Sequence, residues 1–152
     1  MAYTEAEARQ ELLDDLARAT DRLAVALACL GAAYEQLDDQ RSDQLEEQLF
    51  RPTQLAYGRA QRTHAEFADR HGVPRRTFSA ASPGPESQSA GELIERAAEA
   101  IRETEDAIGQ LQDSMLPVEV GDVELRARLS EVRQMLDGLP GRARELIRVL
   151  GR

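Results

Sequence analysis

The 152-residue chain carries 28 acidic residues against 19 basic ones, a formal net charge of -9, and it contains no Lys, no Asn and no Trp. Without lysine, the protein has neither a Schiff-base lysine nor the lysine of a phosphate-binding P-loop. An acidic chain is repelled by phosphate backbones, so we expect no nucleic acid among its partners.

The expected compartment follows from the hydropathy pattern. The first residues, MAYTEAEARQ, do not have the pattern of a signal peptide. No apolar stretch approaches the ~18 residues of a membrane helix, and no basic amphipathic stripe predicts binding to a membrane surface. The single Cys29 lies in an apolar run and is expected to be a buried thiol. We therefore expect one cytoplasmic domain over residues 1–152 that does not contact a membrane.

The first predicted helix spans residues 5–39. Thr4 and Glu7 have the spacing of a capping box at its start. Apolar or small residues then recur at steps of three and four, as in the seam of a bundle helix: Leu12, Leu16, Ala19, Leu23, Ala26, Leu30, Tyr34 and Leu37. Gly31 lowers the helix propensity, and we interpret it as the mark of a close helix crossing.

The middle of this helix, residues 23–34, reads LAVALACLGAAY and has no charged or amide side chain. A helix that is apolar all round is surrounded on every side. The seam residues would line the bundle, which leaves a second face of small residues around Val25, Ala28 and Ala32. The pattern predicts that another chain buries Val25, or else that an alanine-rich surface is exposed.

The second predicted helix spans residues 43–71, with Ser42 as its N-cap and a stop at His71-Gly72. Its inner face consists of Leu45, Leu49, Ala56, Ala60, Thr63 and Phe67. Pro52 lies inside this pattern and predicts a kink in a continuous helix. The following loop, 73–88, is rich in Pro, Ser, Gly and Arg and has no period. We expect a strap or a flexible linker, anchored by Phe78.

The third predicted helix spans residues 90–115 and begins with a capping box at Ser89 and Glu92. Its inner face consists of Ile94, Ala97, Ile101, Thr104, Ile108, Leu111 and Met115. After an extended turn, PVEVGD, the last helix spans residues 122–150 with Asp122 as its N-cap. Its seam keeps register across Pro140, which predicts one bent helix: Leu125, Leu129, Val132, Leu136, Leu139, Ala143, Leu146 and Leu150.

Four such segments predict an all-α fold, an up-down-up-down four-helix bundle with kinks near Pro52 and Pro140. The alternative is a pair of helical hairpins that complete a bundle only by dimerising. Alternating topology would gather acidic residues at one pole and arginines at the other. The acidic pole would contain Asp38, Asp39, Asp43, Glu46, Glu47, Asp113, Glu119, Asp122 and Glu124, and the basic pole Arg70, Arg75, Arg76, Arg142, Arg144, Arg148 and Arg152. Helix dipoles explain most of this pattern, and the functional alternative is a molecule that stacks end to end or meets an anionic partner at its arginine-rich end.

The residues predict no catalytic, cofactor-binding or metal-binding site. His64 and His71 are about 10 Å apart along one helix face, which is too far for one metal ion. No inner-face position is acidic, as a di-iron bundle requires. Residues 113–116, DSML, resemble the Asp-Ser-Leu motif at which acyl carrier proteins take their phosphopantetheine. In that family the serine opens a helix, whereas Ser114 closes one.

We therefore expect a non-enzymatic helical-bundle protein that acts through association with itself, as a homodimer, or with another protein. The alternative is a signalling or small-molecule-binding bundle. Histidine phosphotransfer domains are acidic four-helix bundles with one exposed histidine, and His64 would then be the nucleophile. Those domains carry Lys and Gly shortly after the histidine, whereas AEFADRHG follows His64.

Overall fold

A computed structural model describes residues 4–151 of the protein, and every regular element in that range is a helix. The elements are α1 (Glu5–Tyr34), α2 (Asp39–Leu45), the π-helix η1 (Glu46–Phe50), α3 (Arg51–His71), α4 (Ala90–Asp113), α5 (Leu116–Glu119), α6 (Val123–Leu136) and α7 (Leu139–Leu150). The predicted all-α class is confirmed, because residues 4–151 contain no strand.

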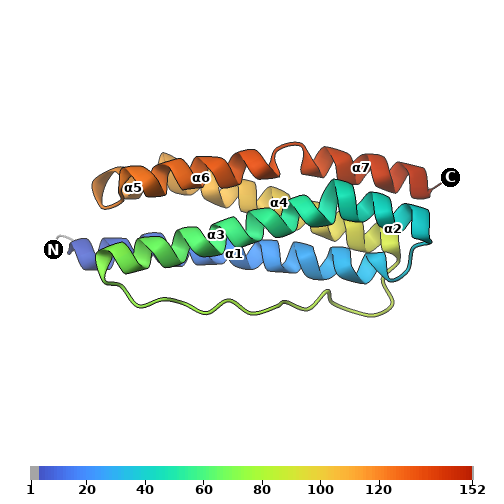
Figure 1. The fold of residues 1–152 in the computed structure, drawn as a ribbon, viewed down its shortest axis with the longest axis horizontal. Helices are drawn as coiled ribbons and strands as arrows, with labels where there is room; N and C mark the ends of the chain where they lie inside the picture. Colours follow the sequence, from blue (N-terminus) through green and yellow to red (C-terminus); the bar gives the residue numbers. More distant parts are fainter. Residues whose placement is uncertain (1–3, 152) are drawn as a thin grey trace.

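The long helices pack side by side along one axis (Figure 1). α1 lies against α3 and α4, α3 against α6, and α4 against α6 and α7. α2, η1 and α3 follow one another without a break. The core between them is built from Leu, Ile, Val and Ala with one large aromatic, Phe67. Close helix packing explains how a chain with so few aromatic residues forms a continuous core.

The predicted inner faces form this core or, at Leu37 and Leu150, pack partly buried against it, and two large residues are exposed. Tyr34 is 38% exposed and Met115 is 59% exposed. Both lie where a helix ends, since α1 stops at Tyr34 and α4 stops at Asp113. A seam predicted from periodicity holds only while the chain remains helical, so its last member can leave the core.

The predicted up-down-up-down order is wrong, because α3 and α4 run in the same direction. Gln36, just after α1, donates from Nε2 to the carbonyl oxygen of Gln88, just before α4, at 2.8 Å. At the other end, Arg9 Nε donates to the carbonyl oxygen of Val120 at 3.2 Å. α4 is therefore antiparallel to α1, and so is α3, which returns from α2 (Figure 1).

The connection between α3 and α4 makes this order possible. Residues 73–88 form no helix or strand and run along the length of the molecule (Figure 1). An extended segment of this length reaches roughly 50 Å, and the 24 residues of α4 span only about 36 Å. We call residues 73–88 the strap. The predicted strap thus connects the end of α3 to the start of α4 at the opposite end of the molecule, and we call this connection the crossover.

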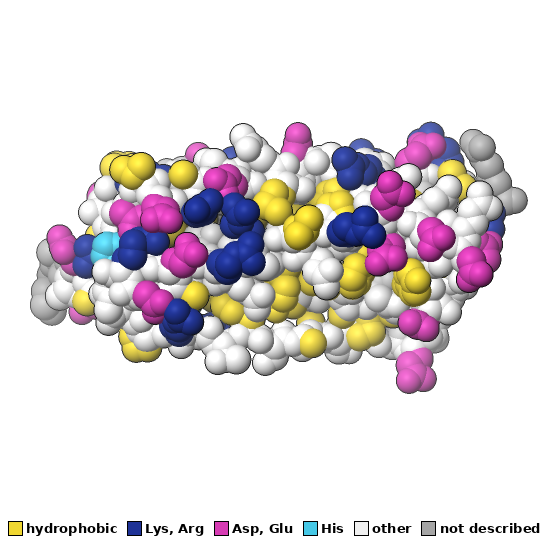
Figure 2. Space-filling view, viewed as in Figure 1, with side chains coloured by type: hydrophobic (Ala, Val, Ile, Leu, Met, Phe, Trp, Pro, Cys, Tyr) yellow, Lys and Arg dark blue, Asp and Glu magenta, His cyan; other side chains and the backbone are white. Residues whose placement is uncertain are grey.

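The predicted separation of acidic and basic poles is also wrong, because it depended on alternating topology. The turn after α1 and the turn before α6 lie at opposite ends of the molecule (Figure 1). Arg70 pairs with Asp122 at one end, and Arg142 donates to the Gln48 carbonyl oxygen at the other. Acidic and basic side chains alternate over the visible face (Figure 2).

Helix boundaries differ most between α1 and α2. α1 ends at Tyr34, five residues earlier than predicted, and Asp38 caps α2 by accepting from the Arg41 amide at 2.9 Å. Ser42, the predicted N-cap, lies inside α2 and donates to the Asp39 carbonyl oxygen. An aspartate with extended backbone is an equally good cap, and the periodicity does not distinguish the two positions.

The remaining caps follow the sequence. Thr4 accepts from the Glu7 amide, which is the first half of the box predicted there. Ser89 and Glu92 form the complete capping box, and Asp122 accepts from the Leu125 amide at 2.7 Å. Gly72 ends α3 with φ of 67°, the left-handed conformation that glycine adopts without strain.

The two prolines act differently. Pro52 lies in the first turn of α3, directly after η1, so the helix continues through Pro52 as predicted, with a π-helical distortion before it. Near Pro140 the predicted single bent helix is wrong, because Gly138 has φ of 81° and separates α6 from α7. The predicted extended turn PVEVGD is wrong in its first half, where Leu116–Glu119 form the single turn α5.

Candidate functional site

The apolar run of α1, residues 23–34, is covered by the protein's own chain. α3 and α4 pack on α1, and the strap reaches Cys29, whose Sγ lies 3.9 Å from the Pro83 carbonyl oxygen. Cys29 is fully buried, and Val25 packs partly buried against the core. Burial raises the pKa of the Cys29 thiol, with Arg96 opposing. Intramolecular neighbours therefore cover most of the run, and its last turn, with Gly31 and Tyr34, stays open to the surface.

Polar contacts hold the strap along its length. Near its start, Arg76 pairs with Asp21 of α1 at 2.8 Å. Near its end, Gln36, which follows α1, donates from Nε2 to the carbonyl oxygen of Gln88 at 2.8 Å. Between them, Phe78 packs edge-on against His64 with 5.3 Å between ring centroids. The predicted anchoring role of Phe78 thus has a specific partner.

His64, the predicted alternative nucleophile, lies inside the molecule and is 3% exposed. Burial and the positive charge of Arg76 lower the pKa of His64, while Asp14 and the backbone of Leu13 oppose them. Its Nδ1 is buried without a hydrogen-bond partner in the described part of the chain. A phosphodonor protein cannot reach an imidazole covered by Phe78, so this arrangement gives phosphotransfer at His64 no support.

His71 lies apart from His64, in a polar clasp between α3 and α6. Its Nε2 lies 3.0 Å from Asp122 Oδ2, and its ring packs against Phe67. Arg70 donates to both oxygens of Asp122, at 2.8 and 3.0 Å. Burial alone would raise the pKa of Asp122, but Arg70, the Leu125 amide and His71 outweigh it and hold that pKa well below its usual value. The clasp joins the end of α3 to the start of α6.

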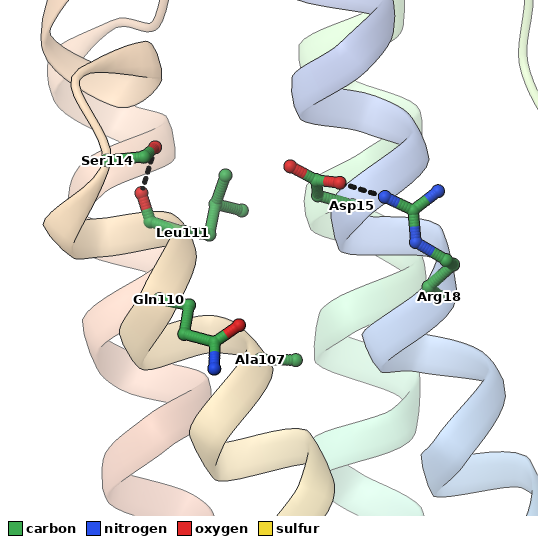
Figure 3. Close-up of a pocket in the computed structure, with 6 residues that line it drawn as sticks. All are labelled: Asp15, Arg18, Ala107, Gln110, Leu111 and Ser114. Atoms are coloured by element: carbon green, nitrogen blue, oxygen red, sulfur yellow. Dashed lines mark hydrogen bonds and ion pairs between the residues drawn. The ribbon is translucent and has the colours of Figure 1, made fainter.

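A groove between α1 and α4, with a volume of about 200 Å³, contains Ser114 (Figure 3). Asp15 and Arg18 pair on α1, and Leu111 points from α4 toward α1. Ser114 Oγ donates to the Leu111 carbonyl oxygen at 2.7 Å and accepts from the Leu116 amide. Both bonds stabilise the end of α4, so Ser114 acts as a helix cap.

Asp15 is the acidic residue in this groove, and its pKa is raised above the ordinary value of an aspartate. Burial is the largest cause and raises the pKa of Asp15; Arg18 opposes it, and Glu11 and Asp14 add to it. No histidine or thiol lines the groove. Asp15 pairs with Arg18 and Ser114 caps α4, so the contacts of both side chains are structural.

Three further grooves mix charges of both signs. One, between α1 and α4, is lined by Arg18, Asp21, Arg22, Glu103 and Ala107. The second, between α3 and α6, is lined by Arg59, Arg62, Thr63, Glu66 and Arg128. The third, between α4 and α6, is lined by Glu105, Gln112, Ser130, Arg133, Gln134 and Asp137. Across residues 4–151, no group of three or more His, Cys, Asp or Glu side chains is placed to hold a metal ion.

One surface feature was not predicted from the sequence. Three large apolar side chains around α5 are exposed: Met115 by 59%, Val118 by 62% and Val123 by 74%. We call these three residues the α5 patch. Apolar side chains gather at the end of the molecule where α5 lies (Figure 2). The sequence offered one sign of this patch. Val118 and Val123 are apolar residues in a segment that has no helical period to bury them.

None of the helices described is both long and apolar enough to cross a membrane. No protein family model, no curated protein and no solved structure matches this chain.

Proposed function

We propose that this chain is a non-enzymatic helical-bundle protein that acts by association through the α5 patch. In this proposal α1, the α2–η1–α3 rod, α4 and the α6–α7 pair are the four members of the bundle. The observation that carries the proposal is the exposure of Met115, Val118 and Val123 within nine positions of the chain. Scattered single apolar residues are normal on a surface, whereas a contiguous group rimmed by polar residues is typical of an interface.

A second copy of the chain is the partner that this patch fits best. An end patch can pair with itself about a twofold axis, because such an interface uses the same residues on both subunits. The patch is small compared with the roughly 1,200 Å² of a stable interface. We therefore expect a weak homodimer, and a larger apolar surface on another protein would bind the same residues more tightly.

The patch can be tested without disturbing the core. Val123 occupies the first position of α6, where an aspartate is favourable for the helix dipole, so Val123→Asp should fold. Light scattering over about 10 to 500 µM should show wild type shifting toward dimer with concentration. Val118→Asp and Val123→Asp should remain monomeric.

Leu55→Asp is the matched control. Leu55 is also apolar and 59% exposed, but it lies on α3, away from α5. It should associate as wild type does. A monomeric wild type at the highest concentration would refute self-association, and equal effects of all three substitutions would refute the assignment to the α5 patch.

A further inference from the structure

A groove of different character lies between the last turn of α1 and η1. It has a volume of about 250 Å³ and is lined by Gly31, Tyr34, Glu35, Glu46 and Phe50. The chain has only three Tyr and three Phe, and two of these six aromatic side chains line this groove. Pockets for drug-sized ligands occupy roughly 300–1,000 Å³. This groove therefore admits a small molecule or head group and is too small for a helix.

The backbone keeps this groove open. Gly31 was predicted to mark a close helix crossing, and that prediction is wrong, because a Cβ added at Gly31 would meet no atom within 4 Å. Opposite it, the first and last residues of η1, Glu46 and Phe50, both line the groove. π-helical turns occur frequently at functional sites. Phe50 packs against the core on one side, which fixes the position of its ring.

The charge of the groove is one-sided. Both ionisable lining residues, Glu35 and Glu46, are carboxylates. Neither forms an ion pair with any residue in the range 4–151. In contrast, each of the four grooves described above includes at least one arginine. The groove at η1 thus combines aromatic rings with negative charge that the protein does not neutralise.

We propose that this groove binds a small organic cation that carries an alkylated ammonium group. Aromatic faces attract such cations, and aromatic side chains surround quaternary ammonium groups in proteins that recognise them. Tyr34 and Phe50 contact the alkyl groups, and Glu35 and Glu46 supply the opposite charge. A hard metal ion takes six or more oxygen ligands, which two carboxylates beside two rings do not provide.

The test is an NMR titration of the full chain with tetramethylammonium chloride. Its neutral counterpart of similar shape is tert-butyl alcohol, and sodium chloride controls for ionic strength. The proposal predicts saturable shifts at the amides of Gly31, Glu35 and Phe50 with tetramethylammonium at about millimolar concentration. The alcohol and the salt should leave these amides unchanged.

Substitutions locate the site. Tyr34→Leu should weaken tetramethylammonium binding by about two- to fivefold, whereas Tyr34→Phe retains the ring and the affinity. Glu46→Gln should weaken binding, and Glu47→Gln is the matched control, since Glu47 is the adjacent acid and does not line the groove. Tyr34 and Glu47 are exposed, so the core remains intact in these variants.

Three outcomes would overturn the proposal. The first is equal perturbation by the cation and the alcohol, which would indicate only apolar contact. The second is the absence of saturation. The third is equal weakening by Glu46→Gln and Glu47→Gln, which would indicate general attraction to an acidic protein. The groove lies at the opposite end of the molecule from α5 (Figure 1), so the oligomeric state does not decide these outcomes.

Discussion

Replacing Asp122 tests whether the clasp between α3 and α6 stabilises the fold through charge or only through capping. Asp122 accepts from the Leu125 amide at the start of α6 and pairs with Arg70 and His71 at the end of α3. Asp122→Ala removes both functions. Asp122→Asn keeps a good N-cap and removes the charge. The difference between the two variants therefore measures the cap, and the difference between Asn and wild type measures the charged contacts.

Typical energies of caps and ion pairs, chosen by the observed exposure of the side chains, set the expected losses of stability. Loss of an N-cap costs about 1 kcal/mol. Hydrogen bonds to charged groups contribute about 1.5–3 kcal/mol when buried, but exposed ion pairs contribute only about 0.2–1 kcal/mol. The Asp122 and Arg70 side chains are 27% and 31% exposed, so solvent screens their contact and we assign it roughly 1 kcal/mol. Asp122→Ala should lower the free energy of unfolding by about 2 kcal/mol and Asp122→Asn by about 1 kcal/mol.

The pH dependence gives an independent check. The folded-state pKa of Asp122 is lowered, so its contribution is fully present above the unfolded value of about 3.9 and is lost as the pH falls below it. Urea unfolding followed by circular dichroism at about pH 7 and pH 3 should show Asp122→Asn losing less stability than wild type on acidification. Equal losses in both proteins, or equal stabilities of the Ala and Asn variants at pH 7, would refute this account of the clasp.

Three further predictions concern glycines, His64 and the strap. Gly31→Ala should raise the free energy of unfolding by about 1 kcal/mol, since a methyl group would meet no atom there. Gly138→Ala should lower the free energy of unfolding by about 1–2 kcal/mol, because φ at this residue is 81°. Urea unfolding measures both changes, and stabilisation by Gly138→Ala would contradict the reasoning. The pKa of His64 is lowered, so the contribution of His64 to stability is full above about pH 6.5 and declines as the pH falls. An NMR titration should give His64 a pKa below about 6.5. His64→Gln should flatten the dependence of stability on pH between about pH 7 and pH 5. Phe78→Ala should increase proteolytic cleavage within residues 73–88, with the helices still intact by circular dichroism; unchanged cleavage would show that Phe78 does not anchor the strap.

Periodicity predicted the buried faces well, because spacing of three and four residues depends only on helix geometry. Phe67, Ile101 and Leu129 were all predicted at inner positions and are fully buried. The same reasoning placed Met115 in the core, where it is exposed, because the helix ends at Asp113. A period identifies a face but gives no information about where the chain leaves the helix.

The candidate sites were less predictable. The groove at η1 depends on a π-helical turn and on a side chain absent at Gly31, and neither has a spacing signature. His64 could be identified from the sequence as one of two histidines, but its burial depends on Phe78, which comes from a segment without a period. Contacts between the strap and the helices are set by topology, which the helical pattern does not encode.

The strap also explains why α1 is apolar all round. By carrying the chain back along the molecule, it lets α4 begin where α1 ends, so α3 and α4 both run antiparallel to α1. The strap itself then lies on α1, where Arg76 pairs with Asp21 and Pro83 reaches Cys29. A helix with neighbours on three sides has no face left for charged side chains in its middle. The apolar middle of α1 is therefore a consequence of the crossover, and a connection too short to span the molecule would leave Cys29 without its contact to Pro83.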